Sequence, residues 1–194
     1  MTSANDFGAP MSGGAGAPSD TAPRIGVVSD THGYLDPSIP DFLAGVDLIL
    51  HAGDMGDPAI LDALSAVAPV TAVAGNLDDD SELPGEVEGE IAGVRFALGH
   101  KRKRLVKRLA GGGNKFDFVV FGHDHVPSVS WVDGTLWLNP GSASAPYEED
   151  EGPTIAVVNR VPAGLAVRFI PLARRKPQPP LPTAKHGKGK IGRS

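Results

Sequence analysis

The first half of the chain alternates short apolar runs with polar segments that contain glycine. Three of these runs are rich in β-branched residues and end in polar clusters, which is typical of buried parallel strands. They are 24–30, 46–54 and 69–76. Between them, 36–45 has an early proline and a final glycine, and 57–68 repeats apolar residues at helical spacing after Asp57, a good helix cap. This β-α-β-α-β order predicts parallel strands joined by right-handed crossovers.

The second half of the chain is richer in strands. We expect one hairpin over 86–100, turning at Ala92 and Gly93, and another over 128–139, where Asp133 and Gly134 form a strong turn signal. The other expected elements are a basic helix over 101–114, a buried strand over 116–125 and a final strand pair over 153–160 and 165–172. Because strands dominate this half, we predict two packed sheets flanked by helices, an α/β/β/α sandwich of four layers.

Both ends of the chain are rich in glycine, proline and small residues and poor in apolar ones. Such segments bury too little surface to become ordered, so we predict disorder over 1–22 and 174–194 and a single domain over 23–173. The last segment contains seven Lys or Arg residues and no acid, whereas the rest of the chain holds 11 basic and 23 acidic residues. A basic tail of this kind is more often a flexible terminus than an arm that binds nucleic acid.

Composition also limits the class of protein. The 194 residues include no cysteine, which excludes disulfides, thiolate metal sites and cysteine nucleophiles. No apolar run reaches the length of a membrane helix. The first residues have neither the basic start nor the apolar centre of a secretion signal. We therefore expect a cytoplasmic protein that does not associate with membranes.

Polar motifs follow the predicted strands and carry the candidate chemistry. Five apolar runs end in such motifs: SDTH at 29–32, HAGD at 51–54, GNLD at 75–78, GH at 99–100 and GHDH at 122–125. Parallel strands bring their carboxyl ends to one edge of a sheet, where open α/β folds bind ligands. We therefore expect seven side chains to converge at that edge: Asp30, His32, Asp54, Asn76, His100, His123 and His125.

Carboxylate, imidazole and amide groups are suitable ligands for Mn, Fe, Zn, Ni or Mg. Seven such groups exceed the needs of one tetrahedral ion, and they suit two ions about 3.5–4 Å apart. Burying so many polar groups without ions would be costly. For any single histidine the alternative is a hydrogen-bonded structural role, but the five motifs together favour a metal pair.

The order of these motifs, followed by NPGS at 139–142, resembles that of the calcineurin-like metallophosphoesterases. The likeness is strongest to the small YfcE-type phosphodiesterases, whose fold is shared by the retromer scaffold Vps29, and it covers about residues 24–173. It implies a metal-bearing β-sandwich flanked by helices, which agrees with the layers predicted above. In the ligand assignment that it implies, Asp54 bridges the two ions. The other ligands are Asp30, His32 and His125 for the first ion, and Asn76, His100 and His123 for the second.

The resemblance implies hydrolysis of phosphoesters by a hydroxide that bridges two divalent ions, with Mn expected and Ni, Zn, Fe or Mg as alternatives. Asp54, Asn76 and His123 are the implied catalytic residues. Many larger relatives have a histidine directly after the Asn of the third motif, where it protonates the leaving group, but this chain has Leu77 there. We therefore expect small phosphodiesters as substrates, with aryl esters hydrolysed faster than alkyl esters.

Two alternative functions remain open. One is a non-catalytic interaction scaffold like Vps29, which would be expected to lack some of the ligands, whereas this chain retains all seven. The other is a phosphomonoesterase, which a histidine at position 77 would favour. The sequence leaves the natural substrate and the oligomeric state open, a homodimer being one possibility.

A run of six cations at 101–108 follows His100. Lys101 and Arg102 are candidates for contacts with substrate phosphate. A contact with nucleic acid and a solvated helix face are the alternatives, and the solvated face is the simplest. Acidic clusters at 78–80 and 148–151 would repel a polyanion, so we favour small phosphodiesters over long nucleic acids.

Several residues near the motifs are expected to support the site rather than to bind ions. Asp78 either orients Asn76 or a ligand histidine, or is a solvated loop acid. His51 is expected to be a buried structural histidine. Gly53, Gly75 and Gly122 are expected to allow close backbone approach, and the NPGS turn at 139–142 is expected to be structural. Trp131 and Trp137 are expected to lie in the core or at an interface.

Overall fold

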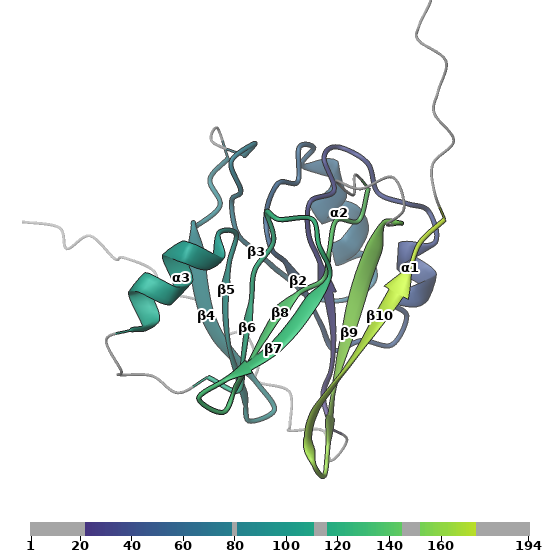
Figure 1. Cartoon of the computed structure of the whole chain (residues 1–194). Coiled ribbons are helices and arrows are strands. Elements are labelled where there is room, and N and C mark those ends of the chain that lie inside the picture. Colours follow the sequence, from purple (N-terminus) through teal and green to yellow (C-terminus); the bar gives the residue numbers. More distant parts are fainter. Residues whose placement is uncertain (1–21, 79–80, 111–115, 145–151, 174–194) are drawn as a thin grey trace, which may run out of the picture.

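Two five-stranded sheets pack face to face, with helices on their outer sides (Figure 1). The computed structural model describes residues 22–78, 81–110, 116–144 and 152–173. The predicted terminal disorder therefore falls almost wholly outside the described residues and stays a prediction. The acidic residues at 79–80 and 148–151 and the end of the predicted basic helix at 111–114 also lie outside them.

The first sheet contains the predicted parallel unit. Its strand order is β10-β9-β1-β2-β3, in which β1 pairs in parallel with β2, and β2 with β3. The strands are β1 (Arg24–Val28), β2 (Leu48–His51), β3 (Val70–Ala72), β9 (Thr154–Val161) and β10 (Gly164–Pro171). Val28 lies opposite His51, and His51 lies opposite Ala72. The three strands therefore end side by side, and their following loops share one edge.

The two helices between these strands are shorter than predicted. They are α1 (Ile39–Phe42) and α2 (Ala59–Ser65). Ile60 and Leu64 of α2 are buried against the first sheet, as their spacing predicts. Asp57 lies one residue before the N-cap, Pro58, and its Oδ1 accepts the N–H of Ala59 at 2.9 Å. The predicted cap thus acts on the start of the helix from just outside it.

The second sheet has the strand order β4-β5-β6-β8-β7. Its strands are β4 (Glu86–Ile91), β5 (Val94–Gly99), β6 (Phe118–Val120), β7 (Ser128–Val132) and β8 (Thr135–Asn139). Both predicted hairpins are confirmed. Each turn has two residues with positive φ, Ala92 (46°) with Gly93 (76°) and Asp133 (48°) with Gly134 (81°), which is the turn geometry that matches strand twist.

The basic run forms α3 (Arg102–Leu109) on the outer side of the second sheet. Leu105 is the buried residue of this helix. These helix residues form ion pairs with strand β4: Glu86 pairs with Arg108 at 2.5 Å and with Arg104 at 3.7 Å, and Arg108 also pairs with Glu88. The helix face is therefore solvated in part, and in part held to the sheet by ion pairs.

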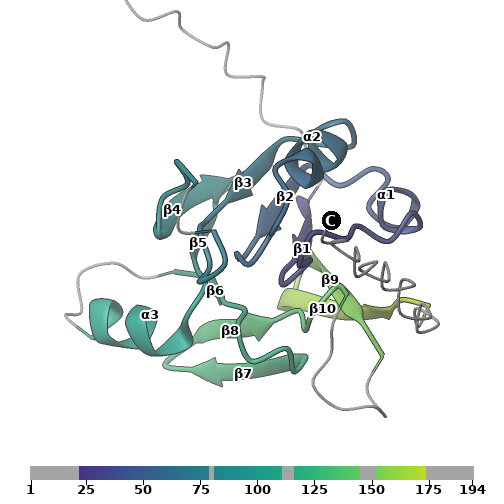
Figure 2. The ribbon, with the colours of Figure 1, turned by 90° about the horizontal axis from the view of Figure 1, so that it is seen from above.

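Three apolar clusters confirm the four-layer α/β/β/α sandwich. The largest lies between the sheets and includes Phe96 and Phe118, one packs α1 and α2 on the first sheet, and one packs α3 on the second. Figure 2 shows α1 and α2 beside one sheet and α3 beside the other. Among the described residues, no helix combines the length and apolar character that crossing a bilayer requires.

The two tryptophans of the second hairpin have different environments. Trp137 is 7% exposed and belongs to the cluster under α3, as predicted for a core residue. Trp131 is 59% exposed on β7, the last strand of its sheet. Of the two environments expected, core or interface, the core is excluded for Trp131, because an edge strand has a partner on one side only. Its role at an interface stays a prediction.

Candidate metal centre

All seven predicted ligand residues lie in loops that leave the carboxyl ends of five strands. Asp30 and His32 follow β1, and the others follow β2, β3, β5 and β6. Backbone hydrogen bonds tie these loops together within each sheet: Asp30 N–H donates to the Gly53 carbonyl at 3.0 Å, and Gly122 N–H donates to the His100 carbonyl at 3.0 Å. Between the sheets, the Ala143 N–H after β8 donates to the Ser29 carbonyl after β1 at 2.9 Å. The loops of both sheets thus meet at one edge, as the strand pattern predicts.

The backbone at this edge adopts an unfavourable conformation. Seven described residues other than glycine have positive φ, and two of them are in the hairpin turns. The other five are Asp30, His32, Asp54, His123 and His125, with φ between 48° and 73°. Side chains with a Cβ disfavour this region, and such residues cluster at functional sites, where the surrounding structure holds them in place. Five of the seven candidate ligands are held in this way.

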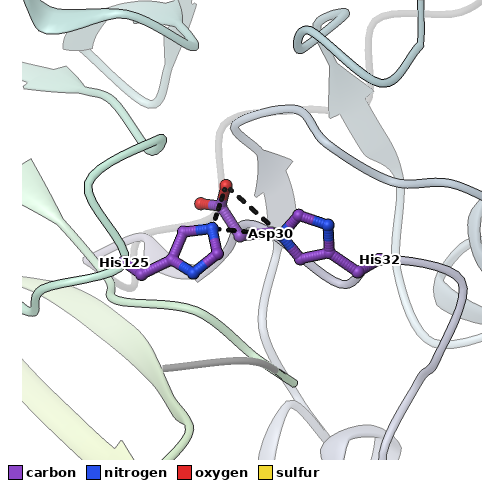
Figure 3. Close-up of side chains that lie close together, drawn as sticks. All are labelled: Asp30, His32 and His125. Carbon is purple, nitrogen blue, oxygen red and sulfur yellow. Dashed lines mark hydrogen bonds and ion pairs between the residues drawn. The ribbon is translucent and has the colours of Figure 1, made fainter. Parts of the chain in front are cut away.

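The first cluster contains Asp30, His32 and His125 (Figure 3). The two imidazole Nε2 atoms are 3.0 Å apart, and Asp30 Oδ1 lies 3.3 Å from that of His125 and 4.0 Å from that of His32. The other carboxylate oxygen, Oδ2, accepts the hydroxyl of Ser29 at 2.5 Å and the N–H of His123 at 3.2 Å. These two hydrogen bonds aim Oδ1 at the histidines.

This cluster fits a cation. Asp30 Oδ1 is buried and has no hydrogen-bond partner, which is costly for a charged oxygen. A proton between the two imidazole nitrogens would satisfy those nitrogens but not the carboxylate, whereas a cation satisfies all three atoms. Ligand atoms at about 2.0–2.2 Å from a tetrahedral ion are about 3.3–3.6 Å apart. The observed separations of 3.0–4.0 Å lie around this value.

The second cluster contains Asp54, His100 and His123, with Asn76 beside them. His100 Nδ1 lies 2.8 Å from the carbonyl oxygen of Ala52, and because a carbonyl only accepts, this nitrogen carries the proton. Nε2 then has its lone pair free, and it faces Asp54 Oδ2 at 3.4 Å and Asn76 Oδ1 at 3.2 Å. Three acceptor atoms directed at one another are what a cation requires, and a second hydrogen bond that fixes the ring is typical of metal-binding histidines.

The electrostatics of this cluster agree with a positive charge between its members. Burial acts to raise the pKa of Asp54, but the hydrogen bonds from His100 and the Leu77 N–H lower it to about 2. Burial acts to lower the pKa of His100, but its hydrogen bonds to Asp54 and Ala52 raise it above the usual value. Without a metal, the proton on His100 supplies the charge that a cation would otherwise supply.

Asp78 differs from both sequence-based alternatives. It is buried, and its carboxylate accepts the N–H groups of Met55 (3.0 Å), Gly56 (3.1 Å) and Gly75 (2.9 Å). It is therefore not a solvated acid, and these contacts reach backbone rather than the side chain of Asn76. Asp78 holds together the loops that follow β2 and β3, which carry two of the candidate ligands.

His51 is the buried structural histidine that the sequence predicts. Its Nδ1 accepts the Gly53 N–H at 3.2 Å, so its Nε2 donates to Thr31 Oγ1 at 3.1 Å. Thr31 in turn donates to the Met55 carbonyl at 3.2 Å. Complete burial lowers the pKa of His51 to about 4, against the pull of the Asp30 and Asp78 carboxylates. The neutral ring thus braces the loops after β1 and β2.

Glycine is required where these loops touch. A Cβ at Gly75 would overlap the carboxylate of Asp54, and a Cβ at Gly122 would lie 2.7 Å from Asp30 Oδ2 and overlap Ser29. Gly53 has a φ of 91°. The predicted close approach is confirmed at all three glycines.

The NPGS turn has the structural role that was expected. Asn139 Nδ2 donates to the Gly122 carbonyl at 3.1 Å, and Ser142 Oγ donates to the Asp30 carbonyl at 2.8 Å. Sequence reasoning missed Ser29, which orients the Asp30 carboxylate. Its position directly before a strand-end aspartate was the available signal.

Lys101 and Arg102 lie near the second cluster in different ways. Lys101 lines a cavity of about 130 Å³ together with Asn76 and His100, and a second one of about 460 Å³ that His123 also lines. The Arg102 guanidinium lies over Phe121 and Trp137, 5.6 and 5.7 Å from the ring centroids. Contact of either cation with substrate stays a prediction.

Curated relatives share the sequence over most of the folded region. A protein of Methanocaldococcus jannaschii named as a probable metallophosphoesterase is 38% identical over 133 residues, which are 63% of this chain and 69% of the relative. Another protein of that organism, named as a phosphodiesterase, is 25% identical over 138 residues, 61% of this chain and 82% of the relative.

Solved structures share the fold. A conserved protein of Streptococcus pneumoniae described as a predicted phosphoesterase has a TM-score of 0.64 at 24% identity, covering 79% of this chain and 91% of that one. Zinc-bound Vps29 of Entamoeba histolytica has a TM-score of 0.60 at 20% identity, covering 76% and 98%. The family model of the calcineurin-like phosphoesterase superfamily domain matches residues 24–160. This match, which agrees with the fold and with the clustered carboxylate and imidazole side chains, shows that the chain belongs to the calcineurin-like phosphoesterase superfamily.

Proposed function

We propose that this protein hydrolyses small phosphodiesters with the help of two divalent metal ions. The observation that carries the proposal is the pair of ligand clusters on strained loops, in which the buried Asp30 Oδ1 lacks a hydrogen-bond partner. The family supports phosphoester hydrolysis, and one relative is named as a phosphodiesterase. That name is the reason for preferring diesters.

The proposed ligands divide as the two clusters do. Asp30, His32 and His125 would hold one ion, and Asn76, His100 and His123 would hold the other, with Asp54, which lies in the second cluster, as the shared ligand. When bound, such a pair supplies hydroxide near neutral pH and neutralises charge on the phosphate oxygens. Mixed carboxylate, imidazole and amide ligands suit Mn, which we propose first, and also Zn, Fe, Ni or Mg.

Residues of this chain determine how substrate is held. Lys101 borders both cavities beside the second cluster, so we propose that it attracts the phosphate. Leu77 follows Asn76 and provides no proton donor for the leaving group. Water or a neighbouring group must therefore supply that proton, and aryl esters, which leave without one, are expected to react faster than alkyl esters. The absence of a histidine at position 77 is a second reason, besides the relative's name, for preferring a phosphodiesterase to a phosphomonoesterase.

A scaffold without catalysis is the alternative that the likeness to Vps29 raises. At 20% identity that likeness bears on the fold alone. The geometry of this chain favours the enzyme, because the buried Asp30 Oδ1 has no hydrogen-bond partner, which is costly in a protein that binds no ion.

The test replaces Asp54 with alanine and uses Asp62→Ala, an exposed acid on α2, as the matched control. Metal-stripped protein is resupplied with Mn, Zn, Ni or Mg and assayed on bis(p-nitrophenyl) phosphate and p-nitrophenyl phosphate. We expect Asp54→Ala to lose at least one bound ion, measured by elemental analysis, and to slow hydrolysis by at least a hundredfold.

Asp62→Ala is expected to keep both its ions and its rate. Full turnover by Asp54→Ala would exclude the two-metal proposal. Faster hydrolysis of the monoester than of the diester would exclude the proposed preference for diesters.

A further inference from the structure

An apolar cavity of about 440 Å³ adjoins the candidate metal centre on the side of α2. Its volume lies in the range of small-molecule sites. Apolar side chains provide much of the lining: Met55, Pro58, Leu61, Leu77 and Leu83. The candidate metal centre described above does not account for this cavity.

Two residues that line the cavity directly follow candidate ligands in the chain. Met55 directly follows Asp54, and Leu77 directly follows Asn76. The Leu77 N–H donates to Asp54 Oδ1 at 2.9 Å, so the backbone that bears this side chain is tied to a candidate ligand. Leu77 is 57% exposed, so its side chain is accessible to a bound molecule. A group attached to a phosphate at the metal centre would therefore have an apolar wall within reach.

The charges around this cavity exclude an anion. Among the described residues, its lining contains no lysine or arginine, but it includes Asp57, Asp78 and Glu82. Asp78 is occupied by three backbone N–H groups, and Asp57 accepts the N–H of Ala59. The acids thus repel negative charge, and these two are already engaged in hydrogen bonds within the fold.

The opposite flank of the metal centre has the reverse character. The two cavities on the side of α3 are lined by more cations than acids: the smaller one has Lys101 and Arg104 with Glu86, and the larger one has Lys101, Arg102 and Lys103 with Asp124. A phosphodiester bound between the flanks therefore meets an apolar and acidic surface on one side and a basic surface on the other.

We propose that the cavity beside Leu77 binds one ester group of the substrate, and that this group is uncharged and apolar, either aryl or branched alkyl. The inference rests on the proposed phosphodiesterase function and narrows its substrate class. Substrates with a second phosphate on this side are excluded, and a diester with unlike ends binds in one direction, with its anionic end toward α3.

The test measures binding rather than turnover, because aryl esters also react faster for chemical reasons. Benzylphosphonate and methylphosphonate share the phosphonate group and differ in the apolar part. Their affinities for the Mn-loaded protein are compared by titration calorimetry. We expect benzylphosphonate to bind on the order of tenfold more tightly, as burial of part of one ring predicts.

Three variants test whether the difference in affinity between the two phosphonates arises in this cavity. Leu77→Ser removes an apolar wall and is expected to reduce the tenfold ratio to about threefold. Ser81→Trp places a large side chain in the cavity from an exposed position and is expected to bring the ratio near one. Val132→Ser, a change at an exposed apolar residue at the turn end of β7, is the matched control and should leave the ratio unchanged.

Equal binding of the two phosphonates to the unaltered protein would overturn the inference, as would an unchanged ratio in both Leu77→Ser and Ser81→Trp. The two proposals fail separately. A protein that hydrolyses diesters without preferring benzylphosphonate keeps the function and loses the cavity assignment. A protein that prefers benzylphosphonate but hydrolyses no diester keeps the cavity as a binding site and loses the function.

Discussion

At the scale of single residues, the site depends on which atom of each side chain is already engaged. Asp30 uses Oδ2 for two hydrogen bonds and keeps Oδ1 for the histidines. His100 uses Nδ1 for a carbonyl and keeps Nε2, whereas His51 has both nitrogens engaged. The first two side chains are therefore oriented as ligands, and His51 is a structural part of the loops.

The burial of His51 predicts how stability depends on pH. In the unfolded chain its pKa is about 6.5, and in the folded chain it is about 4. Above pH 6.5 both states are neutral at this residue. As the pH falls from 6.5 to 4, the unfolded chain binds a proton that the folded chain does not. The free energy of unfolding therefore falls by at most about 3 kcal/mol.

Urea unfolding of the metal-free protein at several pH values measures this loss. His51→Gln removes the titrating group, and its stability should fall less steeply over the same range. His100, whose pKa is raised, contributes with the opposite sign in both proteins and cancels in the comparison. Parallel curves for the two proteins would show that His51 does not carry this dependence.

At the scale of elements, the site is built by loops that touch where side chains are absent. The loops after β2 and β3 meet at Gly75, the loops after β1 and β6 meet at Gly122, and Asp78 binds the backbone of the first pair. Short parallel strands ending at one level bring these loops together, and glycine allows them to approach closely.

Gly75→Ala tests this close approach. The new methyl group would overlap the Asp54 carboxylate, so we expect a loss of about 1–3 kcal/mol in the free energy of unfolding and weaker metal binding. At Gly85 the nearest atom to an added Cβ is 3.7 Å away, and Gly85→Ala should change stability by less than about 0.5 kcal/mol. Urea unfolding and metal titration measure both variants, and equal behaviour would contradict the steric argument.

At the scale of the whole molecule, the first cluster joins the two sheets. Asp30 and His32 follow a strand of one sheet, and His125 follows a strand of the other. An ion held by all three would therefore cross-link the layers of the sandwich. Its binding energy would add to the stability of the entire domain.

Metal removal should consequently lower the stability of the whole fold. At a free Mn concentration a hundred times the dissociation constant, we expect the free energy of unfolding to be about 2.7 kcal/mol higher than that of the protein treated with a chelator. Urea unfolding measures this gain. Asp30→Asn should reduce this gain. Because it removes a buried negative charge of which one oxygen, Oδ1, has no hydrogen-bond partner, its metal-free form should be at least as stable as the unaltered metal-free protein. An equal metal gain in both proteins would exclude Asp30 as a ligand.

The sequence alone was sufficient for the parallel β-α-β-α-β unit of the first half, both hairpin turns, the sandwich and the candidate ligands. Local physics determines these features: apolar periodicity identifies the strands, residues that tolerate positive φ identify the turns, and polar residues after parallel strands must share an edge. The ligand role of each residue remains a prediction that the metal and activity assays will test.

Only the tertiary structure decided the features that depend on partners distant in sequence. The backbone contacts of Asp78, the position of Ser29 against Asp30, the exposure of Trp131 on an edge strand and the cavity beside Leu77 all arise where separate segments meet. The sequence around Asp78 is compatible with a solvated acid and with a buried one. The reason is that burial depends on how the surrounding elements pack rather than on neighbours along the chain.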